Sequence, residues 1–156
     1  MTPAIVTLAA LVLFALAAAW TDVTTRRIGN RLVLACLVVG LGIATWSGGI
    51  ENLGWHVAHA AVALVIGMVL FAIGAMGGGD GKFYAAVAAY FPLQLGLQLG
   101  IAIALTGFVV LVVWFVWRQA TRSRRTPEDD GLFSRLPYGV AIGAGAVVLA
   151  ALPLSA

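Results

Sequence analysis

The sequence predicts an all-α fold, a polytopic integral membrane helical bundle of about six transmembrane helices that forms one domain over residues 1–156. Hydrophobic residues make up 62% of the 156 positions and charged residues only 10%, and the mean hydropathy is +1.05. This composition excludes a water-soluble fold. The charged residues also leave five uncharged intervals, each long enough to cross a hydrocarbon core of about 30 Å. These intervals are 1–21, 32–50, 52–79, 83–117 and 136–156.

The interval 83–117 is too long for one membrane crossing. As a single helix, its 35 residues would measure about 52 Å. The stretch Pro92–Gly100 contains a proline, two glutamines and two glycines, so a turn is expected there. The first interval lacks the basic start of a signal peptide and is interpreted as a membrane helix. The division gives six spans, at roughly 3–21, 32–47, 56–76, 83–95, 98–117 and 137–155.

The positive charges support this division. With six spans and the N-terminus outside, all 9 basic residues fall in three connectors on one side of the membrane. The positive-inside rule then places these connectors in the cytoplasm. The basic residues of these connectors account for the pI near 9.6. Because they are explained as determinants of membrane topology, no nucleic-acid partner is expected. The three connectors are 22–31, 77–82 and 118–136.

Small residues four positions apart predict close helix packing at two places. These pairs are Gly96 with Gly100 and Gly139 with Gly143.

No metal site or cofactor is expected. Cys36 is the only cysteine, so the chain has no disulfide framework and no Cys-x-x-Cys motif. His56 and His59 have a spacing that could present two ligands on one helix face, but a third is lacking unless Glu51 folds back. The two histidines are therefore interpreted as ordinary residues near the outer face.

Two of the six carboxylates are candidates for chemistry. Asp22 ends the first predicted span and Asp80 ends the third, which places both at the same membrane boundary. Acidic residues at that depth cost free energy unless they are paired, hydrogen-bonded or hydrated. Two carboxyl groups held close together share a proton, so one can activate a water while the other protonates a leaving amine. The pair therefore fits aspartyl peptide hydrolysis.

The residues alone leave a structural alternative open. In this alternative, Asp22 caps a helix end and its charge is balanced by Arg26 or Arg27, while Asp80 forms an ion pair with Lys82. Four glycines between positions 77 and 81 surround Asp80 and favour a site instead, because they permit the close approach of a peptide backbone. A flexible turn would explain the glycines but not the acid.

These motifs resemble those of the type IV prepilin peptidase family of bacterial membrane aspartyl proteases, and the resemblance covers nearly the whole chain. Three segments carry it: Gly77-x-Gly79-Asp80 followed by Lys82, Asp22 before Arg26-Arg27-Ile28-Gly29-Asn30, and Pro137-Tyr138-Gly139. The small size is similar to the short form found with tight-adherence (Flp-type) pilus systems.

The resemblance implies that Asp22 and Asp80 are catalytic and that they remove the leader peptide of prepilins at the cytoplasmic face of the inner membrane. The expected partners are a prepilin or pseudopilin with a transmembrane helix and the lipid bilayer. Five residues are expected to bind substrate or support the site; for the last three, membrane anchoring, helix capping and the aromatic belt are the alternatives. They are Gly77, Gly79, Lys82, Asn30 and Tyr138.

The chain departs from the family pattern in two ways. Ile28-Gly29-Asn30 stands where Ile-Pro-Asn is common, which loosens the turn after Asp22. Long members also carry a tetracysteine zinc domain and methylate the new N-terminus; with Cys36 alone, N-methyltransferase activity is not expected. Three other functions stay open: an archaeal preflagellin-type peptidase, a membrane transporter with an aspartate relay, and a noncatalytic scaffold.

Overall fold

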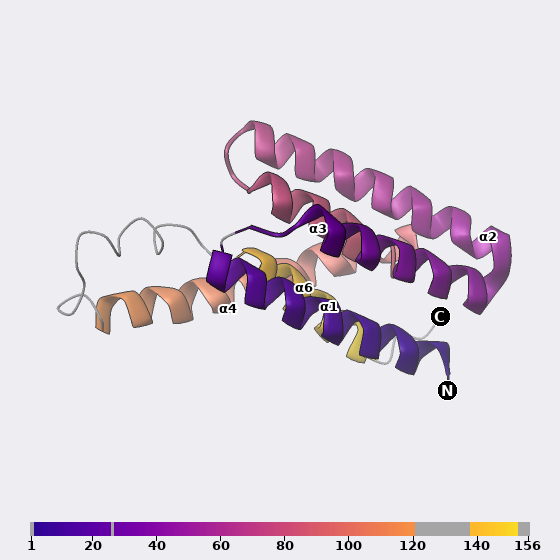
Figure 1. Cartoon of the computed structure of the whole chain (residues 1–156), viewed down its shortest axis with the longest axis horizontal. Coiled ribbons are helices and arrows are strands. Elements are labelled where there is room, and N and C mark those ends of the chain that lie inside the picture. Colours follow the sequence, from indigo (N-terminus) through magenta and orange to yellow (C-terminus); the bar gives the residue numbers. More distant parts are fainter. Residues whose placement is uncertain (1, 26, 121–137, 153–156) are drawn as a thin grey trace.

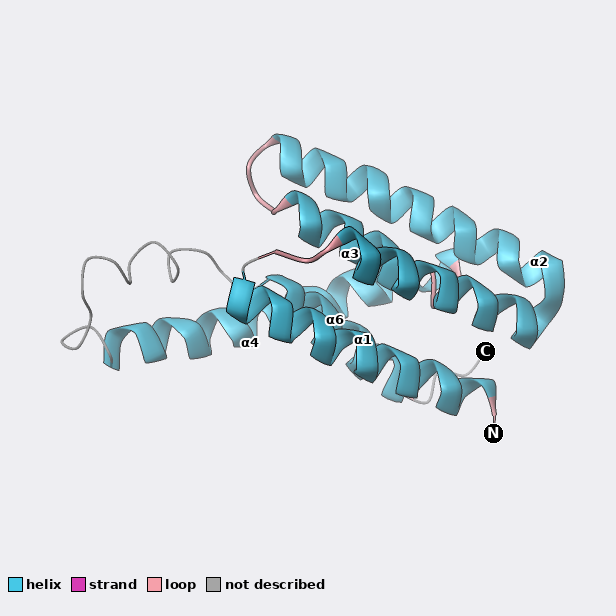
Figure 2. Cartoon of the chain, in the orientation of Figure 1, coloured by secondary structure: helices cyan, strands magenta, loops and turns pink. Residues whose placement is uncertain are grey.

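The computed structural model describes residues 2–25, 27–120 and 138–152 of the chain. Within these ranges all regular secondary structure is helical, which confirms the predicted all-α class. Figure 2 shows the described residues as helices, with short loops between α1 and α2 and between α2 and α3. The elements are α1 (Pro3–Thr25), α2 (Asn30–Ala72), α3 (Gly78–Ala88), the 3₁₀ turn η1 (Leu93–Leu95), α4 (Gly96–Ala120) and α6 (Tyr138–Ala151).

Helix α2 is a hairpin of two arms, 30–47 and 50–72. The helical backbone is interrupted at Gly48 and Gly49, where Gly49 has φ 69° and ψ −161°, and the chain reverses direction there (Figure 1). Positive φ is rare for residues with a side chain, so glycine suits this turn. The Asn52 side-chain amide donates to the Ala44 carbonyl at 3.2 Å and braces the reversal. The two arms correspond to the predicted spans 32–47 and 56–76, with a much shorter connector than expected.

The helix predicted at 83–95 is shifted. Helix α3 begins at Gly78 and ends at Ala88, so Asp80 lies in its first turn and not at the end of the preceding helix. Eleven residues measure about 16 Å, roughly half of a hydrocarbon core. Pro92 follows the turn after Ala88 and lacks the amide N–H that a continuing helix would need.

Two histidines from α2 stabilise the C-cap of α3 and the turn that follows it. The Nδ1 atoms of His56 and His59 lie 2.8 Å from the Ala89 carbonyl oxygen and 2.9 Å from the Phe91 carbonyl oxygen. The last carbonyls of a helix have no partner within it, and lipid offers no donor. Both rings are buried. The pair therefore has a structural role in this fold.

Glycines allow three close helix contacts. A Cβ on Gly143 would lie 2.7 Å from the Cβ of Ala15 in α1, and one on Gly145 would lie 2.7 Å from the backbone of Ile103 in α4. With Gly139, Gly143 forms a small-residue face toward α1, which confirms the packing predicted for this pair. Of the other predicted pair, Gly96 packs closely on His59, whose Nε2 would lie 3.2 Å from an added Cβ, whereas Gly100 has open space around it.

The third contact, between the second arm of α2 and α3, leads to a stability prediction. A Cβ on Gly67 would lie 2.8 Å from the Gly81 Cα and 2.9 Å from its carbonyl oxygen. Backbone cannot yield as a side-chain tip can, so Gly67→Ala should destabilise the protein by about 2 kcal/mol. Gly42→Ala is the control, because nothing lies within 4 Å of its added Cβ and alanine favours a helix interior. Thermal unfolding in detergent should separate the variants; equal midpoints would contradict the expectation.

The outer surface is apolar, as lipid requires. Leu13, Trp20, Ile50, Ile73 and Leu97 are each more than half exposed, whereas a soluble monomer rarely exposes large contiguous apolar patches. Among the residues that the structure describes, three helices are long and apolar enough to cross a membrane: α1, α2 and the continuous segment Leu93–Ala120. The chain is therefore a membrane protein, and the count of six crossings stays a prediction.

Four chain segments meet at one end of the bundle. Figure 1 shows the C-terminal end of α1, the loop between α2 and α3, and the start of α6 on the same side, with the end of α4 extending beyond them. The described basic residues lie near these segments along the chain: Arg27 in the loop after α1, Arg31 in the first turn of α2, Lys82 in α3 and Arg118 in the last turn of α4. The other five fall outside the described residues: Arg26, Arg122, Arg124, Arg125 and Arg135.

Candidate active site

A pocket of about 770 Å³ lies at this end of the bundle. It is lined by residues of α1, α2, α3 and α6 and of the loops between them, so distant segments of the sequence build one site. The polar side chains around it are Asp22, Arg27, Asn30, Asp80, Lys82 and Tyr138.

Asp22 is held almost entirely inside the protein. It lies in the last turns of α1 and is 6% exposed. Its Oδ2 accepts a hydrogen bond from the backbone amide of Gly139 at 3.0 Å. A buried carboxylate requires such donors, because water no longer solvates it.

Asp80 is fixed by the start of its own helix. Gly77 is the N-cap of α3, which makes Asp80 the third helical residue, and its carboxylate accepts a hydrogen bond from the Gly77 backbone amide. This is the backward contact that an acidic residue makes in a capping box. A Cβ on Gly77 would lie 2.6 Å from the Asp80 Oδ2. The Asp80 carboxylate can therefore occupy this position only because residue 77 has no side chain.

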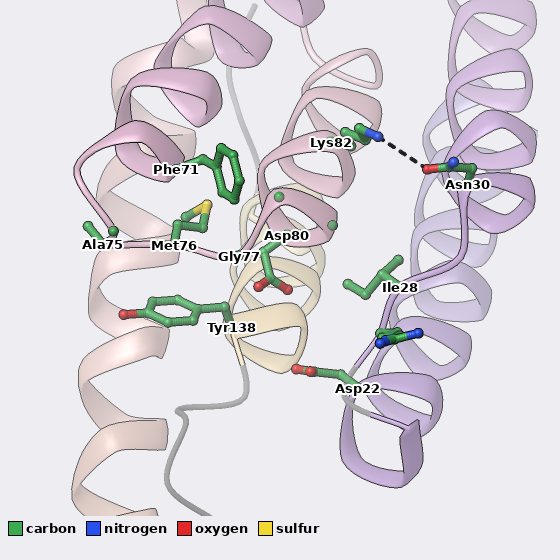
Figure 3. Close-up of a pocket in the computed structure, with 14 residues that line it drawn as sticks. Asp22, Ile28, Asn30, Phe71, Ala75, Met76, Gly77, Asp80, Lys82 and Tyr138 are labelled. Atoms are coloured by element: carbon green, nitrogen blue, oxygen red, sulfur yellow. Dashed lines mark hydrogen bonds between the residues drawn. The ribbon is translucent and has the colours of Figure 1, made fainter. Parts of the chain in front are cut away.

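The two carboxylates share one space. Figure 3 shows both pointing into the region between α1, α3 and α6. Burial, and secondly the charge of Asp22, raise the pKa of Asp80 from 3.8 to about 6, against a smaller opposing effect of the Gly77 amide. A proton therefore stays on the pair well above the usual range of a carboxyl group, which is what acid and base roles in one site require.

The five predicted supporting residues all line this pocket. Lys82 Nζ donates to Asn30 Oδ1 at 3.4 Å (Figure 3); the lysine is therefore directed to α2, and the alternative in which it pairs with Asp80 is wrong. Gly79 packs on the backbone of Ile28, where an added Cβ would lie 3.4 Å from the carbonyl oxygen. Tyr138 lies beside the pocket, with its hydroxyl directed away from the aspartates (Figure 3).

Sequence reasoning missed four contributors: Ile28, Phe71, Met76 and Gly139. The first three give the pocket an apolar wall. Ile28 was visible in the motif Ile28-Gly29-Asn30 but was given no role, and nothing in the sequence context of Phe71 and Met76 distinguishes them from other apolar residues. Gly139 was visible in the motif Pro137-Tyr138-Gly139, but its contribution is a backbone amide, which no residue type reveals. Within the described residues, no group of three His, Cys, Asp or Glu side chains could hold a metal ion.

A helical membrane protein with two aspartates directed into one half-polar pocket has the general arrangement of a membrane-embedded hydrolase. Residues 9–119 match the model of the type IV leader peptidase family. This match covers more than half of the chain, so the chain belongs to that family, and the resemblance noted from its motifs is confirmed. Both aspartates lie within the matched residues, whereas Tyr138 and Gly139 lie beyond them. No curated protein and no solved structure matched the chain.

Proposed function

We propose that this peptidase is an aspartic endopeptidase that removes the leader peptide of Flp-type prepilins at the cytoplasmic face of the inner membrane. The observation that carries the proposal is the placement of Asp22 and Asp80 in one pocket at the end of the bundle, with the basic residues Arg27 and Lys82 also in its lining. Under the positive-inside rule that end faces the cytoplasm.

The reaction needs one ionised and one protonated carboxyl group. The ionised aspartate takes a proton from a water as that water attacks the scissile carbonyl carbon, and the protonated aspartate donates to the carbonyl oxygen. When the tetrahedral intermediate collapses, the C–N bond breaks and the amine leaves with a proton from the pair. The raised pKa of Asp80 supports Asp80 as the proton donor, with Asp22 as the base.

The other functions have less support. A transporter relay would place acidic groups near the middle of the membrane. Here Asp22 lies near the C-terminal end of α1 and Asp80 in the first turn of α3, and these two helix ends lie at the same end of the bundle (Figure 1). A noncatalytic scaffold gives no reason for a glycine in contact with a half-buried carboxylate. A preflagellin-type peptidase would share the same pair and differ only in substrate.

The test is cleavage of a co-expressed Flp-type prepilin, read by gel shift and by the mass of the new N-terminus. Wild type should remove the leader and leave an unmethylated N-terminus. Glu51→Gln, which changes an exposed carboxylate of α2 outside the pocket, should behave as wild type. If several prepilins remain intact while a preflagellin is cut, the substrate assignment is wrong; if neither is cut, the peptidase assignment to this pair is wrong.

The pH dependence of cleavage follows from Asp80. A proton donor with a pKa of about 6 loses its proton as pH rises, so kcat should fall above that value, approaching about tenfold per pH unit. At low pH the partner aspartate becomes protonated and activity should fall again. A pH–rate profile in detergent or liposomes measures both limbs. A rate that stays constant from pH 6 to 9 would contradict the role of Asp80 as acid.

A further inference from the structure

We propose that Gly139 is a positioning residue for Asp22. Its amide fixes the orientation of the Asp22 carboxylate, and its lack of a side chain leaves space for that carboxylate and for Ile28. The inference rests on the proposed function, in which Asp22 is catalytic, and it adds a residue outside the segment that matches the family model.

The contact is direct and leaves little room. The Gly139 amide donates to Asp22 Oδ2 at 3.0 Å. A Cβ at position 139 would lie 2.9 Å from Ile28 Cδ1, 3.1 Å from Asp22 Oδ2 and 3.3 Å from Asp22 Cβ. The backbone of Gly139 is outside the positive-φ region, so conformational freedom does not explain the glycine. The glycine is explained by the space that Ile28 and the Asp22 side chain need beside it.

A helix start is suited to this role. Gly139 is the second described residue of α6, and amides in the first turn of a helix have no acceptor within it. The aligned peptide dipoles also favour negative charge at that end. A hydrogen bond from such an amide to an ionised carboxylate is charge-assisted, and it is stronger than a hydrogen bond between two neutral groups. Because Asp22 is 6% exposed, water cannot readily replace this donor.

The rest of α6 holds the donor in place. Gly143 packs on Ala15 of α1 and Gly145 on Ile103 of α4. The Thr106 hydroxyl of α4 also donates to the Ala141 carbonyl oxygen at 2.9 Å. The amide is thus part of a helix packed against two others, so the carboxylate orientation it sets is a property of the bundle.

Kinetics of Gly139→Ala test the role. The added methyl should displace the carboxylate and lower kcat about 20-fold, with KM within about twofold, since the substrate contacts remain. Ile28→Val removes the Cδ1 atom at 2.9 Å, so combining it with Gly139→Ala should restore part of kcat. Gly107→Ala is the matched control, because its Cβ meets α6 at an ordinary 3.6 Å from Ala141 Cβ; it should keep wild-type kcat. Full activity of Gly139→Ala, or no rescue by Ile28→Val, overturns the proposal.

A spectroscopic measurement keeps this proposal separate from the proposed function. In ¹⁵N-glycine-labelled protein, the Gly139 amide is the resonance missing from Gly139→Ala. Asp22→Asn replaces a charged acceptor with a neutral one, so this amide proton should move upfield while that of Gly107 stays in place. An unmoved Gly139 resonance refutes the contact. If the resonance moves but wild type cleaves no prepilin, the contact stands and the proposed function fails.

Discussion

Asparagine at position 22 or 80 should lower prepilin cleavage by about a thousandfold or more while the protein remains folded. The amide has nearly the shape of the carboxyl group, but it cannot take a proton from water or donate one as an acid. General acid and base catalysis each contribute about 10² to 10⁴ in rate, and the proposed reaction depends on both. The measurement is single-turnover cleavage in liposomes with each variant at equal folded concentration.

Asp80→Asn should lower the activity of the protein but raise its free energy of unfolding at neutral pH. The pKa of Asp80 rises from 3.8 to about 6 in the folded protein, so the fold binds the carboxyl proton more tightly than the unfolded chain does. Stability that depends on this proton is present at low pH and is lost as pH rises through about 4 to 6. Asparagine stays neutral at every pH, so the variant does not lose this stability when the pH rises. After allowance for its partial exposure, we expect about 1 kcal/mol of added stability at pH 7.

Glu51→Gln is the control for both measurements, since its carboxylate is exposed and outside the pocket. It should keep full activity and an unchanged stability profile. Cleavage by Asp22→Asn or Asp80→Asn at more than a few per cent of the wild-type rate would refute the two-aspartate mechanism. An inactive variant that is also unfolded would show a structural role instead, which circular dichroism distinguishes.

Much of the fold could be predicted from the sequence, because uncharged intervals of sufficient length identify membrane helices. The helix boundaries could not. A helix beginning at Gly78 contradicts the low helix propensity of glycine, and tertiary contacts explain it: Asp80 reaches back to the Gly77 amide, and Gly81 must lie against the backbone of Gly67. The reversal at Gly48 and Gly49 also depends on Asn52, which braces it from the second arm.

The site could be predicted in part for a related reason. Acidic residues are so scarce in this chain that Asp22 and Asp80 were recognisable as candidates. Their convergence depends on the rotation of α1 and α3 about their axes, which hydropathy alone does not define when almost every face is apolar. The Gly139 amide could not be found at all, since a backbone donor has no signature in the sequence.

Gly77→Ala should lower kcat about a hundredfold, although the substitution adds a single methyl group. The backbone at Gly77 has φ −71° and ψ 145°, which alanine adopts without strain. The cost arises instead from the 2.6 Å separation between the new Cβ and Asp80 Oδ2. A carboxylate that swings away leaves the Gly77 amide and loses its orientation toward Asp22, and small displacements of a catalytic group cost about 10²-fold in rate.

Gly78→Ala is a close control, one residue along the same turn. Its Cβ would lie 3.4 Å from the nearest ring atom of Phe71, an ordinary contact, and alanine is preferred to glycine inside a helix. We expect wild-type kcat and equal or higher thermal stability. If Gly77→Ala and Gly78→Ala lose activity equally, the glycines serve the flexibility of the loop. If only Gly77→Ala loses it, and its pH–rate profile also changes shape, the glycine serves the placement of the Asp80 carboxylate.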